Sequence, residues 1–432
     1  MKILMYGWEF PPQISGGLGT ACFGLTQALV AAGHQITFVL PKLNPAGNGK
    51  SHVTLVGSDQ VQAENTRYAT AAEASTQGML KMEAVSSPLG PYINNQEYAR
   101  LLLYLQQVMR ENTETFCHPS RLNISGDYGP NLMAEISRYA AVAGTIAKKT
   151  PHQVIHAHDW ITIPAGLEAR RVSGQPLVVH IHSLEFDRCG DNINQDVFDI
   201  ERAGMERADR IISVSAFTKN KIIRHYGISP DKITVVHNGV VRHAGVVRAR
   251  RRTRNKMVLF LGRITFQKGP DYFVEAAARV LSVRKDVDFV MAGSGDMMHR
   301  MMNRVAELKI GRHFHFPGFM RGPDVAKIYA MSDLYVMPSV SEPFGISPLE
   351  AMQQNVPVII SRQSGISEVV GSVFKVDFWN THELAGKILA LLKYAPVRRE
   401  MVKNAAQELG RITWENAAGR VSGVYNQLAA RG

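Results

Sequence analysis

The sequence predicts an α/β protein made of two doubly wound domains, each built on a parallel β-sheet. A chain of 432 residues has the length of two or three ordinary domains. Short apolar runs alternate with segments of helical character along most of it, and this alternation predicts parallel sheets covered by helices. The stretch 242–256 interrupts the alternation with seven Lys or Arg and no Asp or Glu. We therefore expect domains over residues 1–241 and 257–412, joined by a basic linker over 242–256.

The composition is that of a globular protein from a reducing compartment. Hydrophobic residues make up 45% of the chain, and its three cysteines, Cys22, Cys117 and Cys189, form no CxxC pair and no metal-ligand spacing. The start, Met1-Lys2-Ile3-Leu4-Met5, runs at once into polar residues and prolines, so we expect no signal peptide, and no apolar stretch approaches the length of about 18 residues that spans a bilayer. We expect a soluble, cytoplasmic protein. Its net charge of +12, from 49 basic and 37 acidic residues, favours anionic partners.

The first domain is expected to open with a βαβ unit. An apolar strand over Lys2–Tyr6 is followed by a glycine-rich turn, a helix over 20–32 and a strand over 36–40. Glycine allows close backbone approach, and a helix N-terminus is electropositive, so such a turn can hold a phosphate. Gly16 and Gly17 are therefore candidate phosphate-binding residues, with a plain tight turn as the alternative interpretation.

The remaining elements follow from apolar periodicity and from turn residues. The stretch 59–78 is rich in Ala, Thr and Gln without periodicity and predicts a loop. The pattern further predicts helices over 97–116, 132–149, 196–207 and 272–284 and from Phe217, and strands over 177–181, 210–214, 257–261, 289–292 and 334–337.

Two polar clusters lie at the ends of consecutive strands in the first domain. His156-Ala157-His158-Asp159-Trp160 closes one strand, and the segment from His182 to Arg188 follows the other. Histidines and carboxylates in this number suggest a metal site. We interpret His156 and His158 as pointing to opposite faces of their strand, so that they cannot share an ion, and we expect no metal. The position at strand ends favours functional roles for Asp159 and His182.

The second domain places two cations between its first strand and its first helix. Arg263 and Lys268 lie in the segment Gly262-Arg263-Ile264-Thr265-Phe266-Gln267-Lys268-Gly269. Both side chains can neutralise a diphosphate, because each is a hydrogen-bond donor with a full positive charge.

The segment from Ser339 to Gln353 sets two carboxylates around a loop that leads into a helix. The apolar strand 334–337 precedes it, Pro343 and Gly345 end the strand, and the following residues suit a helix. Backbone N–H groups of Gly345, Ile346 and Ser347 would then face an anion or a polar ligand at the strand end. Glu342 and Glu350 would flank that ligand.

This segment resembles the signature of the retaining glycosyltransferases of the GT-B fold, the superfamily that contains glycogen and starch synthases and families 4 and 5. The shared features are two Glu separated by seven residues, with Pro343-Phe344-Gly345 after the first. The resemblance implies that Glu342 contacts the donor sugar, that Glu350 holds the ribose hydroxyls of the nucleotide, and that Phe344, Gly345 and Ile346 line the donor.

Further matches to the same family imply roles for residues elsewhere in the chain. Asp159 corresponds to an aspartate on the acceptor side, and His182 to a histidine that approaches the donor sugar. Arg263 and Lys268 correspond to the cations that stabilise the departing nucleoside diphosphate. Gly293-Ser294-Gly295 is expected to edge the nucleotide pocket, so Gly293 and Gly295 join the donor-binding set.

The resemblance also covers both ends of the chain. Gly16-Gly17-Leu18 is similar to a segment of glycogen synthases, although Ile14-Ser15 stands where the bacterial enzymes carry Lys-Thr. The GT-B fold implies that the last helix, over 414–430, crosses back so that residues 413–432 complete the first domain.

These observations predict a retaining hexosyltransferase that moves glucose from a nucleotide sugar to an α-glucan, without a metal or other cofactor. Three alternatives remain: transfer of another hexose, such as mannose, to a small or lipid-linked acceptor; a non-catalytic carbohydrate-binding protein; and a nucleic-acid-binding protein. For the run 242–256 we favour a solvated linker over a patch for nucleic acid or an acidic membrane surface, because no aromatic residues that could stack on bases interrupt it.

Overall fold

The computed structural model describes residues 1–11, 16–43, 51–61, 131–241, 247, 249, 251 and 253–430. The helix expected over 97–116, most of the loop expected over 59–78, and Ile14-Ser15 lie outside the described residues. No helix within these described ranges has the length and apolar character that crossing a bilayer requires.

The first sheet has seven strands, and all of its pairings are parallel. Its strand order is β3-β2-β1-β4-β5-β6-β7. The bounds are β1 Lys2–Tyr6, β2 Gln35–Leu40, β3 Thr54–Gly57, β4 Val154–His158, β5 Leu177–Ile181, β6 Arg210–Ser213 and β7 Ile233–Val235.

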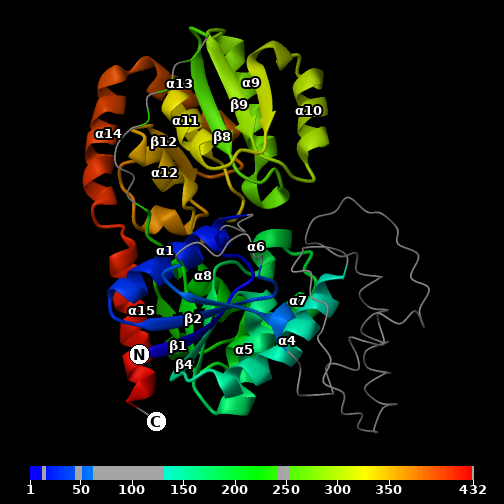
Figure 1. Ribbon diagram of the computed structural model, residues 1–432. Helices are drawn as coiled ribbons and strands as arrows, with labels where there is room; N and C mark the ends of the chain where they lie inside the picture. Colours follow the sequence, from blue (N-terminus) through cyan, green and yellow to red (C-terminus); the bar gives the residue numbers. More distant parts are fainter. Residues whose placement is uncertain are drawn as a thin grey trace, which may run out of the picture.

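The second sheet has six strands, which are also paired in parallel, in the order β10-β9-β8-β11-β12-β13. The bounds are β8 Lys256–Leu261, β9 Val287–Ala292, β10 Phe314–Gly318, β11 Leu334–Met337, β12 Val358–Ser361 and β13 Phe374–Val376. Figure 1 shows the two sheets in separate halves of the molecule, with the strands of the first in blue to green and those of the second in green to orange.

Each sheet reverses its strand order beside its own first strand. In the first sheet β1 pairs with both β2 and β4, and in the second β8 pairs with both β9 and β11. In doubly wound sheets ligands bind outside the carboxyl ends of the strands at such switch points. The ends of β4, β8 and β11 are therefore the places where a ligand site is expected on geometric grounds.

Helices cover both sheets. Those of the first half are α1 Gly17–Ala31, α4 Leu132–Lys149, α5 Ile163–Ser173, α6 Glu185–Cys189, α7 Gln195–Arg207 and α8 Ala216–Lys221. The rest are α9 Pro270–Val283, α10 Met298–Glu307, α11 Pro323–Met331, α12 Ser347–Gln353, α13 Thr381–Lys393, α14 Ala395–Leu409 and α15 Trp414–Ala429. The alternation of strands and helices confirms the α/β class and the two doubly wound sheets predicted from sequence.

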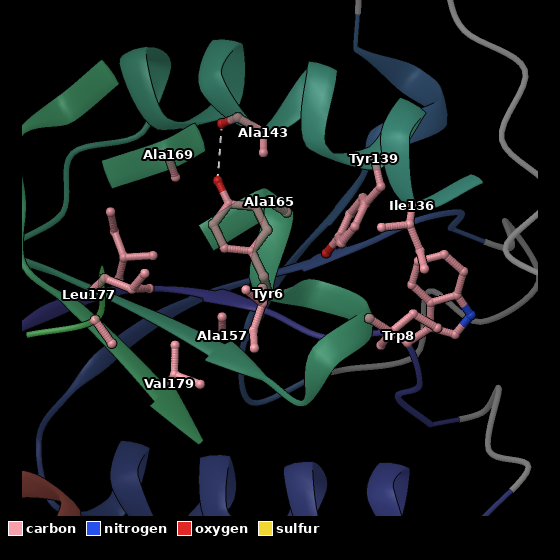
Figure 2. Close-up of a cluster of buried hydrophobic side chains, with 14 of the residues drawn as sticks. Tyr6, Trp8, Ile136, Tyr139, Ala143, Ala157, Ala165, Ala169, Leu177 and Val179 are labelled. Carbon is pink, nitrogen blue, oxygen red and sulfur yellow. Dashed lines mark hydrogen bonds between the residues drawn. The ribbon is translucent and has the colours of Figure 1, made fainter. Parts of the chain in front are cut away.

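One face of the first sheet packs against α4 and α5. Figure 2 shows the buried cluster there, where Tyr6 of β1 and Tyr139 of α4 lie among aliphatic side chains. Both tyrosine hydroxyls are satisfied by backbone oxygens: Tyr6 donates to Ala143 at 3.0 Å and Tyr139 to Val39 at 2.8 Å. Burial therefore costs these two phenols no unmet hydrogen bond.

The other face of the first sheet packs against α1 and the carboxyl-terminal helix α15. Trp414, Val421 and Tyr425 of α15 are buried in one cluster with Leu25 of α1 and Phe38 of β2. Figure 1 shows α15, in red, running beside the amino-terminal half, so both ends of the chain lie there. The crossing of the last helix back to the first domain, which the family resemblance implied, is confirmed.

The contact between α1 and α15 leads to a stability prediction with opposite signs for two glycines. A Cβ on Gly24 of α1 would fall 2.3 Å from the Trp414 ring, whereas a Cβ on Gly423 of α15 would meet nothing within 4 Å. Gly24→Ala should lower stability by about 1–3 kcal/mol through overpacking. Gly423→Ala should raise it by about 0.5–1 kcal/mol, because alanine restricts the unfolded chain and favours the helix.

Thermal unfolding of the two variants beside the unmodified chain measures both effects. Equal midpoints for Gly24→Ala and Gly423→Ala would show that α15 does not pack against α1 as described.

Candidate active site

An ion pair between Lys268 and Glu342 lies at the switch point of the second sheet. Lys268 ends the short 3₁₀ helix Phe266–Lys268 that follows β8, and Glu342 lies in the loop after β11. The Lys268 Nζ atom donates to Glu342 Oε2, and the Ser339 hydroxyl donates to the same oxygen at 3.2 Å. Glu342 is 6% exposed, so this charge is buried and compensated. Two residues that the sequence predicted to act on one donor are thus in contact.

Arg263 belongs to the same loop system but makes a different contact. Its guanidinium is exposed, and Nη2 donates to the Gln267 side-chain oxygen at 2.9 Å. The Gln267 backbone oxygen accepts from Val340 N at 2.9 Å. Gln267 therefore ties the loop of Arg263 to the loop of Glu342, and Arg263 itself is exposed.

Close backbone packing explains why Gly293 and Gly295, two positions that we predicted to bind the donor, are glycines. A Cβ on Gly293, where φ is +145°, would lie 1.8 Å from the Gly262 oxygen, and one on Gly295 would lie 2.3 Å from the Ile264 oxygen. The loops after β8 and β9 can approach each other this closely only because both positions lack a side chain. Gly345 has φ +102°, a conformation that favours glycine at the turn before α12.

Helix α12 follows the turn and carries Glu350 in its first turn. The Tyr329 hydroxyl of α11 donates to Glu350 Oε2 at 3.3 Å. Phe344 is buried in the second domain, and Ile346 packs against buried clusters of both domains. Along the chain Glu342 thus precedes the turn and Glu350 follows it, on α12.

Asp159 occupies the switch point of the first sheet, directly after β4. Its backbone has φ +60° and ψ 172°, a conformation that costs a residue other than glycine about 1–3 kcal/mol. The carboxylate offsets this strain: Oδ1 accepts from the backbone N–H of His182 at 2.6 Å and of Ser183 at 3.1 Å. Burial raises the pKa of Asp159 to about 7, although these amides and Arg188 act in the opposite direction. Asp159 thereby fixes the loop that carries His182.

The histidines of β4 and β5 correct one interpretation made from sequence. The rings of His156 and His158 stack at 4.4 Å between centroids, on the face of the sheet that α1 and α15 cover. Residues two apart in a strand share a face, so assigning them to opposite faces was wrong. His180 and His182 of the neighbouring strand stack beside them at 4.2 Å.

These four histidines form two hydrogen-bonded pairs. His182 Nε2 meets His158 Nδ1 at 3.0 Å, and His156 Nε2 meets His180 Nδ1 at 3.2 Å. Burial lowers the pKa of His182 to about 3, and that of His158 far below its usual value. All four rings are therefore neutral at neutral pH.

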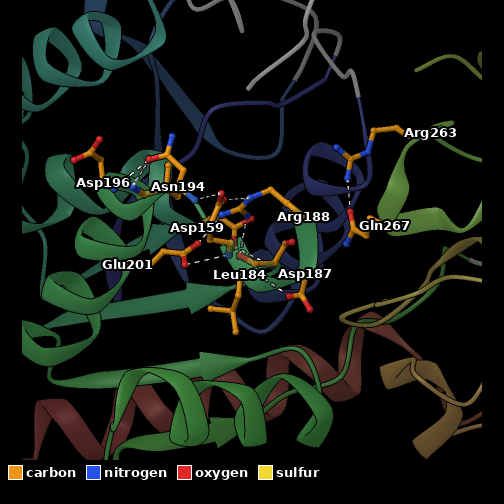
Figure 3. A network of polar contacts seen from close by, with 12 residues as sticks. Asp159, Leu184, Asp187, Arg188, Asn194, Asp196, Glu201, Arg263 and Gln267 are labelled. Atoms are coloured by element: carbon orange, nitrogen blue, oxygen red, sulfur yellow. Dashed lines mark hydrogen bonds and ion pairs between the residues drawn. The ribbon is translucent and has the colours of Figure 1, made fainter. Parts of the chain in front are cut away.

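A buried polar network surrounds the loop after His182. Figure 3 shows Asp159, Arg188 and Glu201 gathered around Leu184, with Arg263 and Gln267 of the second domain in the same view. Arg188 donates to Glu185 at 3.0 Å, to Glu201 at 2.7 Å and to the Ser183 oxygen at 3.3 Å. Burial alone would lower the pKa of Arg188, but Glu201 and Glu185 raise it, so its charge persists.

The two domains meet through hydrogen bonds between these strand-end loops. Lys221 Nζ donates to Asp187 Oδ1 at 2.6 Å and to the Ser341 hydroxyl at 2.7 Å, and that hydroxyl donates to Asp187 at 2.5 Å. Ser341 immediately precedes Glu342. This set, which we call the domain junction, links the Asp159–His182 side to the Lys268–Glu342 side.

Arg188, Glu201 and the residues of the domain junction were not predicted as site residues. Arg188 and Asp187 lie within a strand-end cluster that the sequence singled out, so their position was the available signal. Ser341 likewise lies within the predicted segment Ser339–Gln353, but Lys221 lies in no such cluster. The pairing itself has no local signal, because the three residues are separated from one another by 34 to 154 residues along the chain.

A second contact between the domains involves the N-terminus of α8. Glu368 accepts from the backbone N–H of Ala216 at 2.9 Å and of Phe217 at 2.6 Å, and His237 Nε2 lies 2.9 Å from the same carboxylate. The Ser215 hydroxyl donates to the Pro343 oxygen at 2.6 Å. Pro343 belongs to the loop of Glu342, so this loop is held by the first domain on two sides.

Two other segments singled out in the sequence are the turn at Gly16 and Gly17 and the basic stretch 242–256. Gly16 caps the N-terminus of α1 and Gly17 begins it, and both are exposed. In the described part of the stretch 242–256, Arg251 and Lys256 both pair with Asp333, the latter at 3.0 Å. Part of the basic charge is thus neutralised within the second domain.

Two protein-family models match the chain. Residues 110–243 match the model for "Glycosyltransferase Family 4", and residues 247–408 match the model for "Glycosyl transferases group 1". The boundary between the two matches lies in the basic stretch.

Curated relatives span most of the chain. An uncharacterized glycosyltransferase of Methanocaldococcus jannaschii is 27% identical over 98% of both chains, and a glycogen synthase of Mycobacterium tuberculosis is 26% identical over 86% of this chain and 80% of its own. A D-inositol 3-phosphate glycosyltransferase of Acidothermus cellulolyticus is 30% identical over 67% of this chain and 71% of its own.

Solved structures share the fold. Sucrose-phosphate synthase of Thermosynechococcus elongatus superimposes with a TM-score of 0.73, covering 100% of both chains at 19% identity. An Anabaena protein in complex with UDP and glucose superimposes with a TM-score of 0.66, covering 99% of this chain and 100% of its own at 17% identity.

Two doubly wound sheets, family models that match residues 110–243 and 247–408, and a relative 30% identical over two thirds of each chain lead to one conclusion. This chain belongs to the GT-B glycosyltransferases, in the group that includes families 4 and 5.

Proposed function

We propose that this glycosyltransferase transfers a hexosyl group, glucosyl in the first instance, from a nucleotide sugar to an α-glucan with retention of configuration. The observation that carries the proposal is the buried Lys268–Glu342 pair at the switch point of the second sheet. Arg263, which is exposed, donates to Gln267, the residue before Lys268. The domain junction connects the Glu342 loop to the segment that follows His182. A cation, a carboxylate and a second cation at one strand end suit a sugar diphosphate.

Lys268 and Arg263 would act on the leaving group. In the structure Glu342 neutralises Lys268, and the charge of Arg263 is met only by the neutral amide of Gln267 in the contacts described above. A bound diphosphate would offer Lys268 a second acceptor. Negative charge on the diphosphate grows as the glycosidic bond breaks, so both cations would stabilise the transition state more than the ground state.

Glu342 and Glu350 would bind opposite ends of the donor. Release of Glu342 from Lys268 would leave its carboxylate available to hydroxyls of the donor sugar. Glu350 would accept hydrogen bonds from ribose hydroxyls, with Tyr329 fixing one of its oxygens. The ribose does not change during transfer, so Glu350 would contribute equally to binding in the ground and transition states.

His182 and Asp159 would act on the side of the sugar and the acceptor. A neutral His182 can hydrogen-bond to a sugar hydroxyl without adding a positive charge beside the developing oxocarbenium ion. Attack by the acceptor from the leaving-group face, or through a short-lived ion pair, would give retention. The same strand-end loops would exclude water that could hydrolyse the donor.

The α-glucan acceptor rests on the segments Gly16-Gly17-Leu18, Asp159 and His182 and on the glycogen synthase among the relatives. A second candidate is transfer to a small acceptor such as a phosphorylated polyol. It is favoured by the relatives that act on D-inositol 3-phosphate, one of which is the relative with 30% identity.

The first prediction concerns donor and acceptor. Incubation of labelled glucose and mannose nucleotides with glycogen or maltooligosaccharides should give labelled polymer from ADP-glucose or UDP-glucose, because the proposed donor is a glucose nucleotide. Transfer from a mannose nucleotide to a small acceptor, with none from a glucose nucleotide to glucan, would favour the second candidate.

The second prediction separates transition-state stabilisation from uniform binding. Lys268→Ala and Arg263→Ala should each lower turnover at least about tenfold at saturating donor, because each removes a charge that acts mainly in the transition state. Glu350→Ala should mainly raise the KM for the donor. Steady-state kinetics across donor concentrations measure both quantities.

Lys327→Ala is a matched control, because Lys327 pairs with Asp324 at an exposed position of the same domain. It should retain the kinetics of the unmodified enzyme. Turnover of Lys268→Ala and Arg263→Ala at the unmodified rate, once donor saturates, would reduce both cations to affinity contacts.

The third prediction is that transfer requires no bound metal ion, because Lys268 and Arg263 meet the charge of the leaving group. Prolonged dialysis against a chelator should not lower the transfer rate. Loss of activity that Mg²⁺ or Mn²⁺ restores would contradict this assignment.

A further inference from the structure

We propose that Cys22, His158 and His182 form a binding site for a transition-metal ion of the Zn²⁺ class, and that the bound ion blocks transfer. The first part stands on the geometry of the three side chains. The second part rests on the proposed function, because it assigns His182 to the donor sugar. The ion would be an inhibitor and not a cofactor.

The three ligands come from three elements that the fold brings together. Cys22 lies on α1, His158 ends β4 and His182 follows β5. One ligand atom from each side chain lies within 4.8 Å of the other two. Tetrahedral zinc with Zn–S of about 2.3 Å and Zn–N of about 2.0–2.1 Å places its ligand atoms about 3.3–3.6 Å apart. Small side-chain movements would therefore complete the site.

The histidine pair already has the spacing of two ligands. His158 Nδ1 and His182 Nε2 are 3.0 Å apart, and His158 Nε2 is fully buried without a hydrogen-bond partner among the described residues. Nε2 would carry the ring proton when Nδ1 binds the ion, so each histidine would offer the ion one unprotonated nitrogen. Both rings are neutral, which is the form that binds metals.

The ligand set and its surroundings favour a soft cation. One thiolate and two imidazoles suit Zn²⁺ and similar ions, whereas Mg²⁺ and Ca²⁺ prefer oxygen ligands. Burial raises the pKa of the Cys22 thiol, and so do the carboxylates of Asp159 and Glu9. These carboxylates disfavour a bare thiolate but would attract a divalent cation. Binding would convert the thiol to a metal-bound thiolate and release its proton to water.

A neighbouring set, His156, His158 and His180, has the same proximity but is a weaker candidate. All three rings are buried. His156 and His180 are hydrogen-bonded to each other, and His156 is also hydrogen-bonded to Tyr425. His182 is partly exposed, so an ion can reach the set that contains it. An ion held there would occupy the His182 side chain and keep it from a donor sugar.

Cobalt(II) absorption tests the site directly, using the full chain without an affinity tag. A tetrahedral Co²⁺ site with a thiolate should show visible bands and a sulfur-to-cobalt charge-transfer band, both abolished by excess Zn²⁺. Cys189→Ser is the matched control, because Cys189 is the other described cysteine and lies outside the set. It should keep the spectrum, and Cys22→Ser should lose the charge-transfer band.

Titration gives the affinity change. Loss of an outer-shell partner costs about 10- to 100-fold in metal affinity, and loss of a ligand should cost at least as much. Cys22→Ser and His158→Ala should therefore each weaken Co²⁺ binding at least about tenfold. Thermal unfolding checks that each variant remains folded. No binding by the unmodified chain, or an unchanged charge-transfer band in Cys22→Ser, would overturn the site.

Inhibition is measured separately. Zn²⁺ should inhibit transfer by the unmodified enzyme and by Cys189→Ser, while Cys22→Ser should keep its basal rate and need at least about tenfold more Zn²⁺. Equal inhibition of all three would overturn the inhibitory role. If no donor is used at all, the proposed function fails, but the cobalt spectrum still decides whether the metal site exists.

Discussion

The hydrogen bonds among Asp187, Lys221 and Ser341 are the contact on which the rest of the site depends. They join α6, which follows β5, and the end of α8 to the loop after β11, so the carboxyl edges of two separate sheets face each other. Asp187 is 1% exposed, and a carboxylate buried to this degree is tolerated only with a cation and a hydroxyl beside it. The position of Glu342, one residue after Ser341, follows from this junction.

The two domains contribute different electrostatic environments. On the first domain, Asp159 holds the backbone of His182, and burial keeps four histidines neutral, so these rings add no positive charge on the side that would meet a sugar. On the second domain, Lys268 and Arg263 place positive charge at the end of β8. A donor with an uncharged sugar and an anionic diphosphate matches this asymmetry. The same neutral, buried histidines, with Cys22 nearby, are what would make the site sensitive to a soft metal ion.

Sequence alone predicted the elements and the strand-end positions, because alternating apolar runs dictate parallel sheets whose carboxyl ends share an edge. Strands over Lys2–Tyr6 and Leu177–Ile181 agree with the structure residue by residue. The Lys268–Glu342 pair spans 74 residues and the domain junction up to 154, and no local pattern encodes such pairings. That His156 and His158 share a face was predictable, because side chains two residues apart in a strand point to the same side. The prediction of opposite faces misapplied this two-residue period.

The anomeric configuration of the first-formed product tests the central claim most directly. Proton NMR of the product, recorded early in the reaction with an α-linked nucleotide sugar and a defined acceptor, distinguishes the two configurations. An α-linked product is predicted, because the segment Ser339–Gln353 resembles the signature of retaining enzymes and the proposed function assigns retention. A β-linked product would show inversion and would contradict the roles assigned to the Lys268–Glu342 pair and to His182.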